Sequence, residues 1–167
     1  ALSWLAIDRE DGLWIQRLHP FAAITYSDFS FVDYKVRDPE GIVVAAFDGN
    51  RLTGVSPWMI NLGIDLRLAA GVYANCNYLF NDRLPLDDGN SVFHPGYHVA
   101  NAKIGYQKVI AKRFRFDVYC GIDNLLNQQY SSFVALNAAV YGGGQPAYYN
   151  PSPDRNGYGG VTMGYLF

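Results

Sequence analysis

Apolar and polar residues alternate with a period of two along most of the chain, which is the pattern of β-strands with two unlike faces. In 58–68, for example, Ile60, Leu62 and Ile64 fall on one face, and Asn61 and Asp65 fall on the other. The same alternation runs through 58–68, 72–83, 97–108, 114–124 and 156–167. Further strands are expected at 1–8, 13–34 and 129–138. The pattern predicts about eight antiparallel strands in one all-β unit spanning 1–167, with no helix, linker or second domain.

Composition favours a membrane barrel over a soluble sheet. Aromatic residues make up 16% of the chain, and charged residues make up 17% against a usual share of about 25%. The polar positions hold Asn, Gly, Asp and Thr more than Lys and Glu, and aromatic residues gather near strand ends, as at Trp58, Tyr106 and Phe114. No run approaches the roughly 20 apolar residues of a membrane helix. We therefore expect strands of a closed transmembrane barrel, because lipid leaves backbone groups without partners.

Charge and cysteine usage exclude other classes. The net charge is −2 and basic residues are scattered, so nucleic acid is not an expected partner. Cys76 and Cys120 have no metal-ligand spacing and lie in separate expected strands, so no disulfide is predicted. No leader is visible, so a signal peptide was either removed or lies upstream. A soluble β-sandwich is the last alternative, because it would expose too much aromatic surface.

Four segments in order resemble the closing strands of TonB-dependent receptors. The first is FAAITYSDFSF at 21–31, followed by GNRLTGVSP at 49–57; the family pattern is YTYTDA and then GNRLPGVP, so Thr53 replaces a proline and Ser56 is inserted. The second is HPGYHVANAKIGY at 94–106. The third is GIDNLLNQQY at 121–130, with Leu126 where Phe is usual. The fourth runs from Arg155 to the terminal GYLF at 164–167.

The resemblance implies a fold and a function. The chain would be the C-terminal β-barrel segment of a receptor with about 22 strands, lacking the plug and the earlier strands. Such a receptor sits in the outer membrane of a Gram-negative bacterium. It imports a scarce solute such as a ferric siderophore with energy from TonB, and it has no cofactor. The expected partners are outer-membrane lipid, the receptor's own N-terminal plug, TonB, the barrel-assembly machinery and the large solute.

Candidate site residues follow from the strand pattern and the resemblance. The residues expected to face the lumen or plug are Asp65, Arg67, Asn75, Asn77, Lys103, Arg115, Asp117 and Asp123. The C-terminal signature expected to be read by the barrel-assembly machinery is Met163, Tyr165 and Phe167. The residues that could contact a ligand, from the loop 139–155, are Tyr141, Gln145, Tyr148, Tyr149 and Asn150, although a Gly-rich loop without a ligand role is the slightly stronger interpretation.

No constellation predicts catalysis. Ser131 and Ser132 have no neighbouring His and Asp that would make either a nucleophile. The Gly run at 142–144 is not followed by a helix, so it is not a phosphate-binding loop. His94 and His98 lie near Asp87 and Asp88, so a metal site is conceivable, but a solvated turn is the stronger interpretation. We expect no enzyme activity and no metal.

Placing Phe167 at the periplasmic rim fixes the direction of every expected strand. The loop 139–155 then faces outward, and the turn 125–128, together with 35–57 and 84–96, faces the periplasm. This inverts the usual rule of short periplasmic turns and long outer loops. Either this part of the barrel is an exception or one strand has been missed; we keep the orientation, because the C-terminal signature is the firmer signal.

Two other membrane proteins fit the same pattern. A free-standing eight-stranded barrel with a structural or adhesive role suits the length, and small inward residues such as Gly63, Gly105 and Gly121 suit a narrow lumen. An enzyme on such a barrel would need a Ser/His/acid group at one rim, and the sequence offers none.

Overall fold

The computed structural model describes residues 2–8, 14–138 and 148–167. These residues form strands, turns and loops, and none of them belongs to a helix that could span a membrane. The bounds are β1 Leu2–Ser3, β2 Ile7–Asp8, β3 Ile15–Tyr26, β4 Lys35–Arg37, β5 Val43–Ala46, β6 Trp58–Leu68, β7 Val72–Asn81, β8 Leu84–Pro85, β9 Phe93–His94, β10 Tyr97–Ile110, β11 Phe114–Asp123, β12 Phe133–Val134, β13 Tyr149–Asn150 and β14 Asn156–Tyr165.

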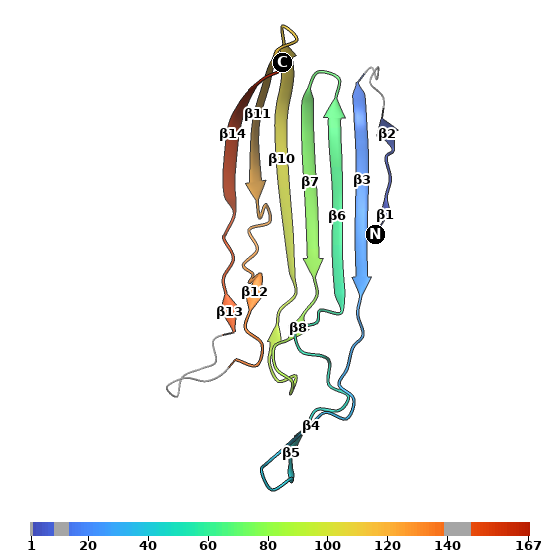
Figure 1. The fold of residues 1–167 in the computed structure, drawn as a ribbon, viewed down its shortest axis with the longest axis vertical. Helices are drawn as coiled ribbons and strands as arrows, with labels where there is room; N and C mark the ends of the chain where they lie inside the picture. Colours follow the sequence, from blue (N-terminus) through green and yellow to red (C-terminus); the bar gives the residue numbers. More distant parts are fainter. Residues whose placement is uncertain (1, 9–13, 139–147) are drawn as a thin grey trace.

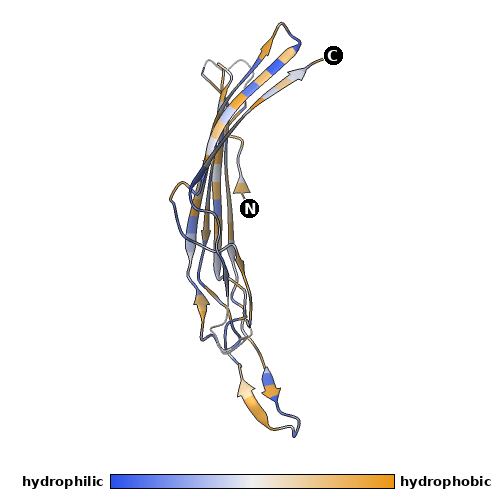
Figure 2. Cartoon of the chain, turned by 90° about the vertical axis from the view of Figure 1, so that its left-hand side faces the viewer, coloured by the Kyte–Doolittle hydropathy of each residue, from blue (hydrophilic) through white to orange (hydrophobic). Residues whose placement is uncertain are grey.

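One antiparallel sheet holds most of the chain. Its strand order is β1-β3-β6-β7-β10-β11-β14, and β2 also pairs with β3. Within the described residues the sheet is open, since β1 and β2 lie along one edge and β14 along the other (Figure 1). Seen from the side, it is a curved layer in which hydrophobic and hydrophilic residues alternate along the strands (Figure 2). The all-β antiparallel fold predicted from the pattern is confirmed.

The expected strand at 129–138 is wrong. Only Phe133–Val134 is extended there, as β12, and it pairs with β13 in a small separate sheet. The final strand, β14, instead pairs directly with β11, from Phe114 opposite Tyr165 to Asp123 opposite Asn156. The described residues between β11 and β14, 124–138 and 148–155, therefore contribute no further strand to the main sheet.

Removing that strand reverses the expected direction of the others. The connections 27–57, 82–96 and 124–155 all lie at one end of the sheet, which we call the loop end (Figure 1). The short turns 69–71 and 111–113 lie at the opposite end, the turn end, together with the C-terminus. The expectation that 35–57, 84–96 and 125–128 share an end with Phe167 is therefore wrong. The usual barrel asymmetry of short turns and long loops is restored.

The two turns at the turn end have the backbone that tight antiparallel connections need. Ala111 and Lys112 both have positive φ (52° and 59°), and the amide of Arg113 bonds the carbonyl of Ile110 at 3.2 Å. Two positive φ values in the centre of a four-residue turn match the twist of the strands they join. At the other turn Gly71 has φ +91°, and a Cβ there would lie 2.3 Å from the carbonyl oxygen of Gln107.

The register places the predicted faces as expected. Across the sheet, Ile64 lies opposite Cys76 and Val118 lies opposite Val161. This apolar face is exposed, with Val161 67% and Met163 70% accessible. Aromatic residues border it at both ends: the rings of Tyr26 and Trp58 are 4.6 Å apart at the loop end, and those of Phe114 and Tyr165 are 5.4 Å apart at the turn end. Such an exposed apolar band between two aromatic borders fits contact with lipid.

On the opposite, polar face, aromatic rings lie over glycines of the neighbouring strand. Gly63 faces Phe21, Gly105 faces Tyr73, and Gly121 faces Tyr158 in the register. A Cβ on these glycines would meet the facing ring at 2.0, 2.3 and 2.4 Å. The glycines therefore leave room for rings that lie flat along the sheet, as in the covering of strand glycines by cross-strand aromatics.

The hairpin of β4 and β5 projects beyond the loop end (Figure 1). At its tip, 38–41, the amide of Ile42 bonds the Asp38 carboxylate at 2.8 Å and Arg37 bonds the Gly41 carbonyl at 2.8 Å. Its base is held by the Tyr34 amide, which bonds the Asp48 carboxylate at 2.8 Å, and by an ion pair between Lys35 and Asp33.

Candidate functional site at the loop end

The most deeply buried residues lie under the three long connections, not in the middle of the sheet. Leu86 is fully buried, and its neighbour Pro85 is less than 2% exposed. The Gly54 amide of the first connection bonds the Pro85 carbonyl at 2.9 Å. The Asn137 amide of the third connection bonds the Leu86 carbonyl at 2.8 Å. The second connection is therefore the centre around which the other two pack.

Polar side chains reinforce this packing between the first and second connections. Asp88 accepts a hydrogen bond from the Thr53 hydroxyl at 2.6 Å and one from the Tyr34 hydroxyl at 3.3 Å. Asn90 accepts from the Arg51 amide at 2.7 Å and donates to the Arg51 carbonyl at 2.9 Å. The GNRLTGVSP segment at 49–57 is thus the part of the first connection that packs against the second.

The two departures from the family pattern in this segment have a structural explanation. Thr53 stands where the pattern has proline, and its hydroxyl supplies the bond to Asp88 that proline could not make. Ser56, the inserted residue, is buried, and its hydroxyl donates to the carbonyl of Asp82 at 2.8 Å. Both changes add contacts between the first and second connections.

Asp87 organises the turn of the second connection. Its carboxylate accepts bonds from the Ser91 hydroxyl at 2.6 Å and from the amides of Ser91 and Val92 at 2.8 and 2.9 Å. Burial raises the pKa of this carboxyl, but the hydrogen bonds from Ser91 and Val92 outweigh burial, and the net pKa is lowered. The carboxylate is therefore a structural acceptor within the turn.

Asn124 fixes the start of the third connection, because its side chain bonds nearby backbone groups. It is 2% exposed and has φ +52°. Its Oδ1 accepts from the Gln128 amide at 2.9 Å, and its Nδ2 donates to the carbonyls of Gln128 at 2.9 Å and Pro153 at 3.3 Å. One side chain thereby joins the start of the long connection to its return.

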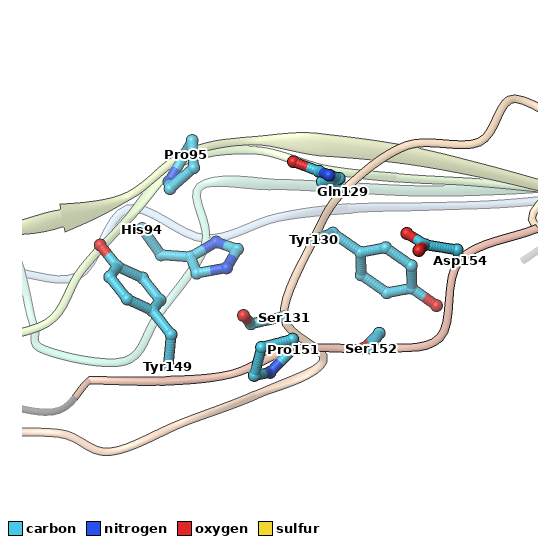
Figure 3. Close-up of a pocket in the computed structure, with 9 residues that line it drawn as sticks. All are labelled: His94, Pro95, Gln129, Tyr130, Ser131, Tyr149, Pro151, Ser152 and Asp154. Atoms are coloured by element: carbon cyan, nitrogen blue, oxygen red, sulfur yellow. The ribbon is translucent and has the colours of Figure 1, made fainter.

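A pocket of about 530 Å³ opens where the second and third connections meet (Figure 3). Its lining residues are His94, Pro95, Gln129, Tyr130, Ser131, Tyr149, Pro151, Ser152 and Asp154. His94 and Tyr149 stand together at one end, 5.7 Å between ring centres, and Tyr130 and Asp154 stand at the other (Figure 3). The pocket combines aromatic surface with a few polar groups, which is the usual composition of a small-molecule site.

His94 is the chemically notable member of this lining. The residue is 2% exposed, and its Nδ1 has no hydrogen-bond partner among the described residues. Burial lowers its pKa, and a weaker interaction with the Pro95 backbone opposes this. Burial therefore favours the neutral form of the ring, whose Nδ1 is enclosed by the surrounding residues rather than open to the pocket. Tyr97 packs its ring edge-on at 5.7 Å and in turn stacks on Tyr130 at 4.8 Å.

The structure brings together only part of the predicted ligand set. Tyr149 lines the pocket, whereas Tyr148 and Asn150 do not. Tyr141 and Gln145 lie outside the described residues. Sequence reasoning missed His94 and Tyr130 as pocket residues, although each belongs to a segment that resembles the family, at 94–106 and 121–130. The sequence pattern places His94 in a solvated turn and Tyr130 among the aromatic residues near strand ends, because the contact between their segments becomes visible only in the fold.

The eight residues predicted to face the lumen share the polar face. Their positions alternate with the apolar face in β6, β7, β10 and β11. Asp65 accepts from Asn75 at 2.6 Å and lies 3.4 Å from His19. Asp117 accepts from the Tyr73 hydroxyl at 2.8 Å. The Nζ of Lys103 lies 4.1 Å from the Tyr119 ring centre. The remaining members are Arg67, Asn77, Arg115 and Asp123.

The C-terminal signature lies on the apolar face at the turn end. Met163 is opposite Phe116 and Tyr165 is opposite Phe114, and the ring of Phe167 lies 5.2 Å from that of Tyr165. The side chains form an exposed apolar tip beside the free edge of β14.

The described residues contain no group of three His, Cys, Asp or Glu side chains placed to hold a metal ion. His98 lies on the apolar face, where its Nδ1 is 2.5 Å from the Tyr78 hydroxyl, so it is separated from His94. Cys76 and Cys120 are free thiols on the same face. In the part of the chain that the structure describes, no hydrogen bond joins Ser131 to His94 in the way a nucleophile would need.

Comparison with known proteins agrees with this architecture. Residues 5–125 match the family model described as TonB dependent receptor-like, beta-barrel. No curated protein sequence matches the chain. Among solved structures, the siderophore receptor PiuA from Acinetobacter baumannii is similar with a TM-score of 0.67 and 16% identity. That likeness covers 89% of this chain and 20% of PiuA, so the chain spans about a fifth of the length of that receptor. At this identity the likeness to PiuA shows the fold alone, whereas the family-model match extends over most of the chain. The chain therefore belongs to the TonB-dependent receptor family, as part of its β-barrel.

Proposed function

We propose that residues 1–167 form the C-terminal barrel segment of an outer-membrane receptor that imports a scarce solute, such as a ferric siderophore, with energy supplied through TonB. The observation that carries this proposal is the open sheet with one apolar and one polar face, bearing three long connections at a single end. An open sheet in lipid needs further strands along its edges, because unpaired backbone groups there cost several kcal/mol each. The receptor's earlier strands and plug would supply these partners.

The arrangement of the loops supports one direction in the outer membrane. The loop end would face the outside and the turn end the periplasm, in keeping with the asymmetry of such barrels. Met163, Tyr165 and Phe167 would then stand at the periplasmic rim, where the barrel-assembly machinery could read them. The eight polar-face residues would face the plug and the water around it.

The loop-end pocket is our candidate for one part of the solute site. His94, Tyr130 and Tyr149 would offer aromatic surface and a neutral imidazole to an arriving solute. A pocket of this size would hold only part of a large solute, so we expect the plug and other loops to contribute the remainder. Of the residues predicted from sequence to contact a ligand, this proposal retains Tyr149.

The proposal is tested in the source bacterium with an antibody against this segment. Outer membranes are compared with and without boiling, and the gene is deleted and the strain grown on a panel of iron sources. We expect a boiled band several times larger than this chain, compact before heating, and loss of growth on at least one iron source that a plasmid copy restores. A boiled band near the 18.6 kDa of this chain would instead indicate a free-standing small barrel with a structural or adhesive role.

A paired substitution tests the pocket. His94→Gln removes the imidazole and should weaken binding of the solute identified by growth, while Tyr148→Phe, just outside the pocket lining, should leave binding unchanged. Equal binding by both variants and the parent would exclude His94 from the solute site and leave the receptor assignment intact.

A further inference from the structure

The described residues that line the loop-end pocket carry one negative charge and no positive charge. Asp154 is the single acidic residue of the lining, and no lysine or arginine belongs to it. His94 is the remaining side chain that could carry a positive charge, and burial favours its neutral form. A molecule that enters the pocket therefore meets one carboxylate with no competing cation.

The charge of Asp154 is not compensated within the protein. In the ranges that the structure describes, no ion pair includes this residue. Arg155 follows it in the chain, and Arg83 lies over the ring of Phe93 at 5.1 Å, but neither arginine lines the pocket. Asp154 is exposed, so water alone solvates its carboxylate, and the charge is open to a cation from outside.

An aromatic ring accompanies the carboxylate at the same end of the pocket. Tyr130 and Asp154 stand together there (Figure 3). The Tyr130 ring is fixed by stacking on the buried ring of Tyr97, with 4.8 Å between centres. The face of an aromatic ring attracts cations. A ring beside a carboxylate therefore suits an alkylammonium group, whose carbons contact the ring and whose N–H groups donate to the carboxylate.

The three long connections around the pocket are acidic as a group. The segments 27–57, 82–96 and 124–155 together hold nine Asp or Glu and five Lys or Arg residues, which gives them a net charge of −4. A surface with an excess of one sign attracts solutes of the opposite sign and repels those of its own. The surroundings of the pocket thus favour the same charge as its lining.

We propose that the loop-end pocket binds the protonated amine of a cationic solute, with the Asp154 carboxylate as counter-charge and the Tyr130 ring as apolar contact. A neutral solute would forgo the ion pair, and an anionic solute would be repelled by Asp154 and by the acidic connections. The inference rests on the proposed function, since it names the charge of the solute that the receptor would import.

Binding is measured on isolated outer membranes that contain the full-length receptor. The probes are radioactively labelled ferrioxamine B, an iron complex with one protonated amine, and its N-acetylated form, which lacks that charge. Asp154→Asn removes the carboxylate charge and keeps the shape of the side chain. Glu40→Gln is the matched control, because Glu40 is an exposed loop-end carboxylate at the hairpin tip and does not line the pocket.

In the parent and in Glu40→Gln, the amine form should bind about tenfold more tightly than the acetylated form. A partly exposed ion pair and a cation–π contact each contribute about threefold. Asp154→Asn should lower the ratio to about threefold, and high salt should lower it in the parent as well.

A cross-link locates the amine. A carbodiimide joins the bound amine to a carboxylate in contact with it, and mass spectrometry of the digested receptor identifies the residue. We expect the link at Asp154 in preference to Glu40. Links formed equally at both residues, equal binding of the two probes, or binding of neither would overturn the proposal.

Growth of the deletion strain separates this inference from the transport function. Growth on every iron source, with the probe preference and the link at Asp154 intact, would refute import and leave the amine site standing. Loss of growth on an anionic or neutral iron source, with no preference for the amine form, would overturn the amine site and leave import standing.

Discussion

Replacing Asn124 by alanine should release the start of the third connection from its return. The change removes three side-chain hydrogen bonds, to the Gln128 amide and to the carbonyls of Gln128 and Pro153. Each contributes about 1 kcal/mol net in a folded protein. Alanine must also hold a φ of +52°, at a further cost of about 1 kcal/mol relative to asparagine. The opening free energy of this turn should therefore fall by about 4 kcal/mol.

Hydrogen exchange of the Gln128 amide measures that opening directly. A loss of about 4 kcal/mol corresponds to a protection factor lower by roughly a thousandfold, since each 1.4 kcal/mol is a factor of ten. Exchange in β10 should change little, because its ladders with β7 and β11 are intact. Protection of Gln128 in Asn124→Ala close to that of the parent would refute the assignment of these bonds.

Two further variants separate the causes. Asn124→Gly also loses the hydrogen bonds but adopts positive φ without strain, so it should be protected about fivefold better than the alanine variant. Asn124→Asp keeps the acceptor for the Gln128 amide and loses only the two donated bonds. If glycine and alanine exchange at the same rate, backbone strain plays no part at this position.

Three other changes follow from the packing and the burial. In Gly54→Ala, the added Cβ would lie 2.5 Å from the Leu136 side chain, and the backbone there has φ +80°. The change should therefore loosen the first connection and increase trypsin cleavage after Arg51 on whole cells. Gly105→Ala should lower the temperature at which the folded band converts to the unfolded band in gels, by displacing the Tyr73 ring. Burial lowers the folded-state pKa of His94 below its ordinary 6.5, so the unfolded state binds the proton more readily. Hydrogen-exchange protection around the pocket should therefore fall as the pH drops below about 6.5. His94→Gln should remove this pH dependence.

Each of these changes has a matched control. Gly49→Ala shares the positive φ of +79° but meets no atom within 4 Å, so it isolates backbone strain from the contact with Leu136. Gly164→Ala lies on the same polar face as Gly105, and its Cβ would reach only Arg115 at 3.9 Å. It should leave the conversion temperature unchanged. If Gly49→Ala increases cleavage as much as Gly54→Ala, the packing explanation fails.

The faces and the sheet could be predicted from sequence because β-strands in a membrane barrel repeat a simple rule at every second residue. The alternation in 58–68 and 114–124 places each side chain on the face where the register has it. The segment 129–138 carries a shorter alternation of Val134 and Leu136, but there it reflects local packing. The Leu136 side chain lies against Gly54, in another connection, and nothing in the segment itself distinguishes that contact from a place in the sheet.

Counting 129–138 as a strand of the sheet inverts the expected orientation of the preceding strands. The inverted orientation itself indicates that the strand count is wrong. Short loops outside and long ones inside conflict with barrel architecture, and one strand fewer removes the conflict. The loop-end contacts, by contrast, had no sequence signal. Thr53 and Asp88 are 35 residues apart, and Asp88 and Asn137 are 49 apart. Hydrogen bonds between such distant segments leave no periodic trace along the chain.

The hairpin of β4 and β5 projects beyond the loop end, and its tip lies apart from the pocket around His94 (Figure 1). Its tip at 38–41 is stabilised by its own hydrogen bonds, and a Cβ on Gly41 would meet no atom within 4 Å. In the orientation proposed above, an antibody or a phage arriving from outside would reach this tip before the packed connections behind it. The tip could then change its sequence under immune or viral pressure while the pocket around His94 keeps its shape. The same independence makes the tip a suitable place to insert an epitope for surface display.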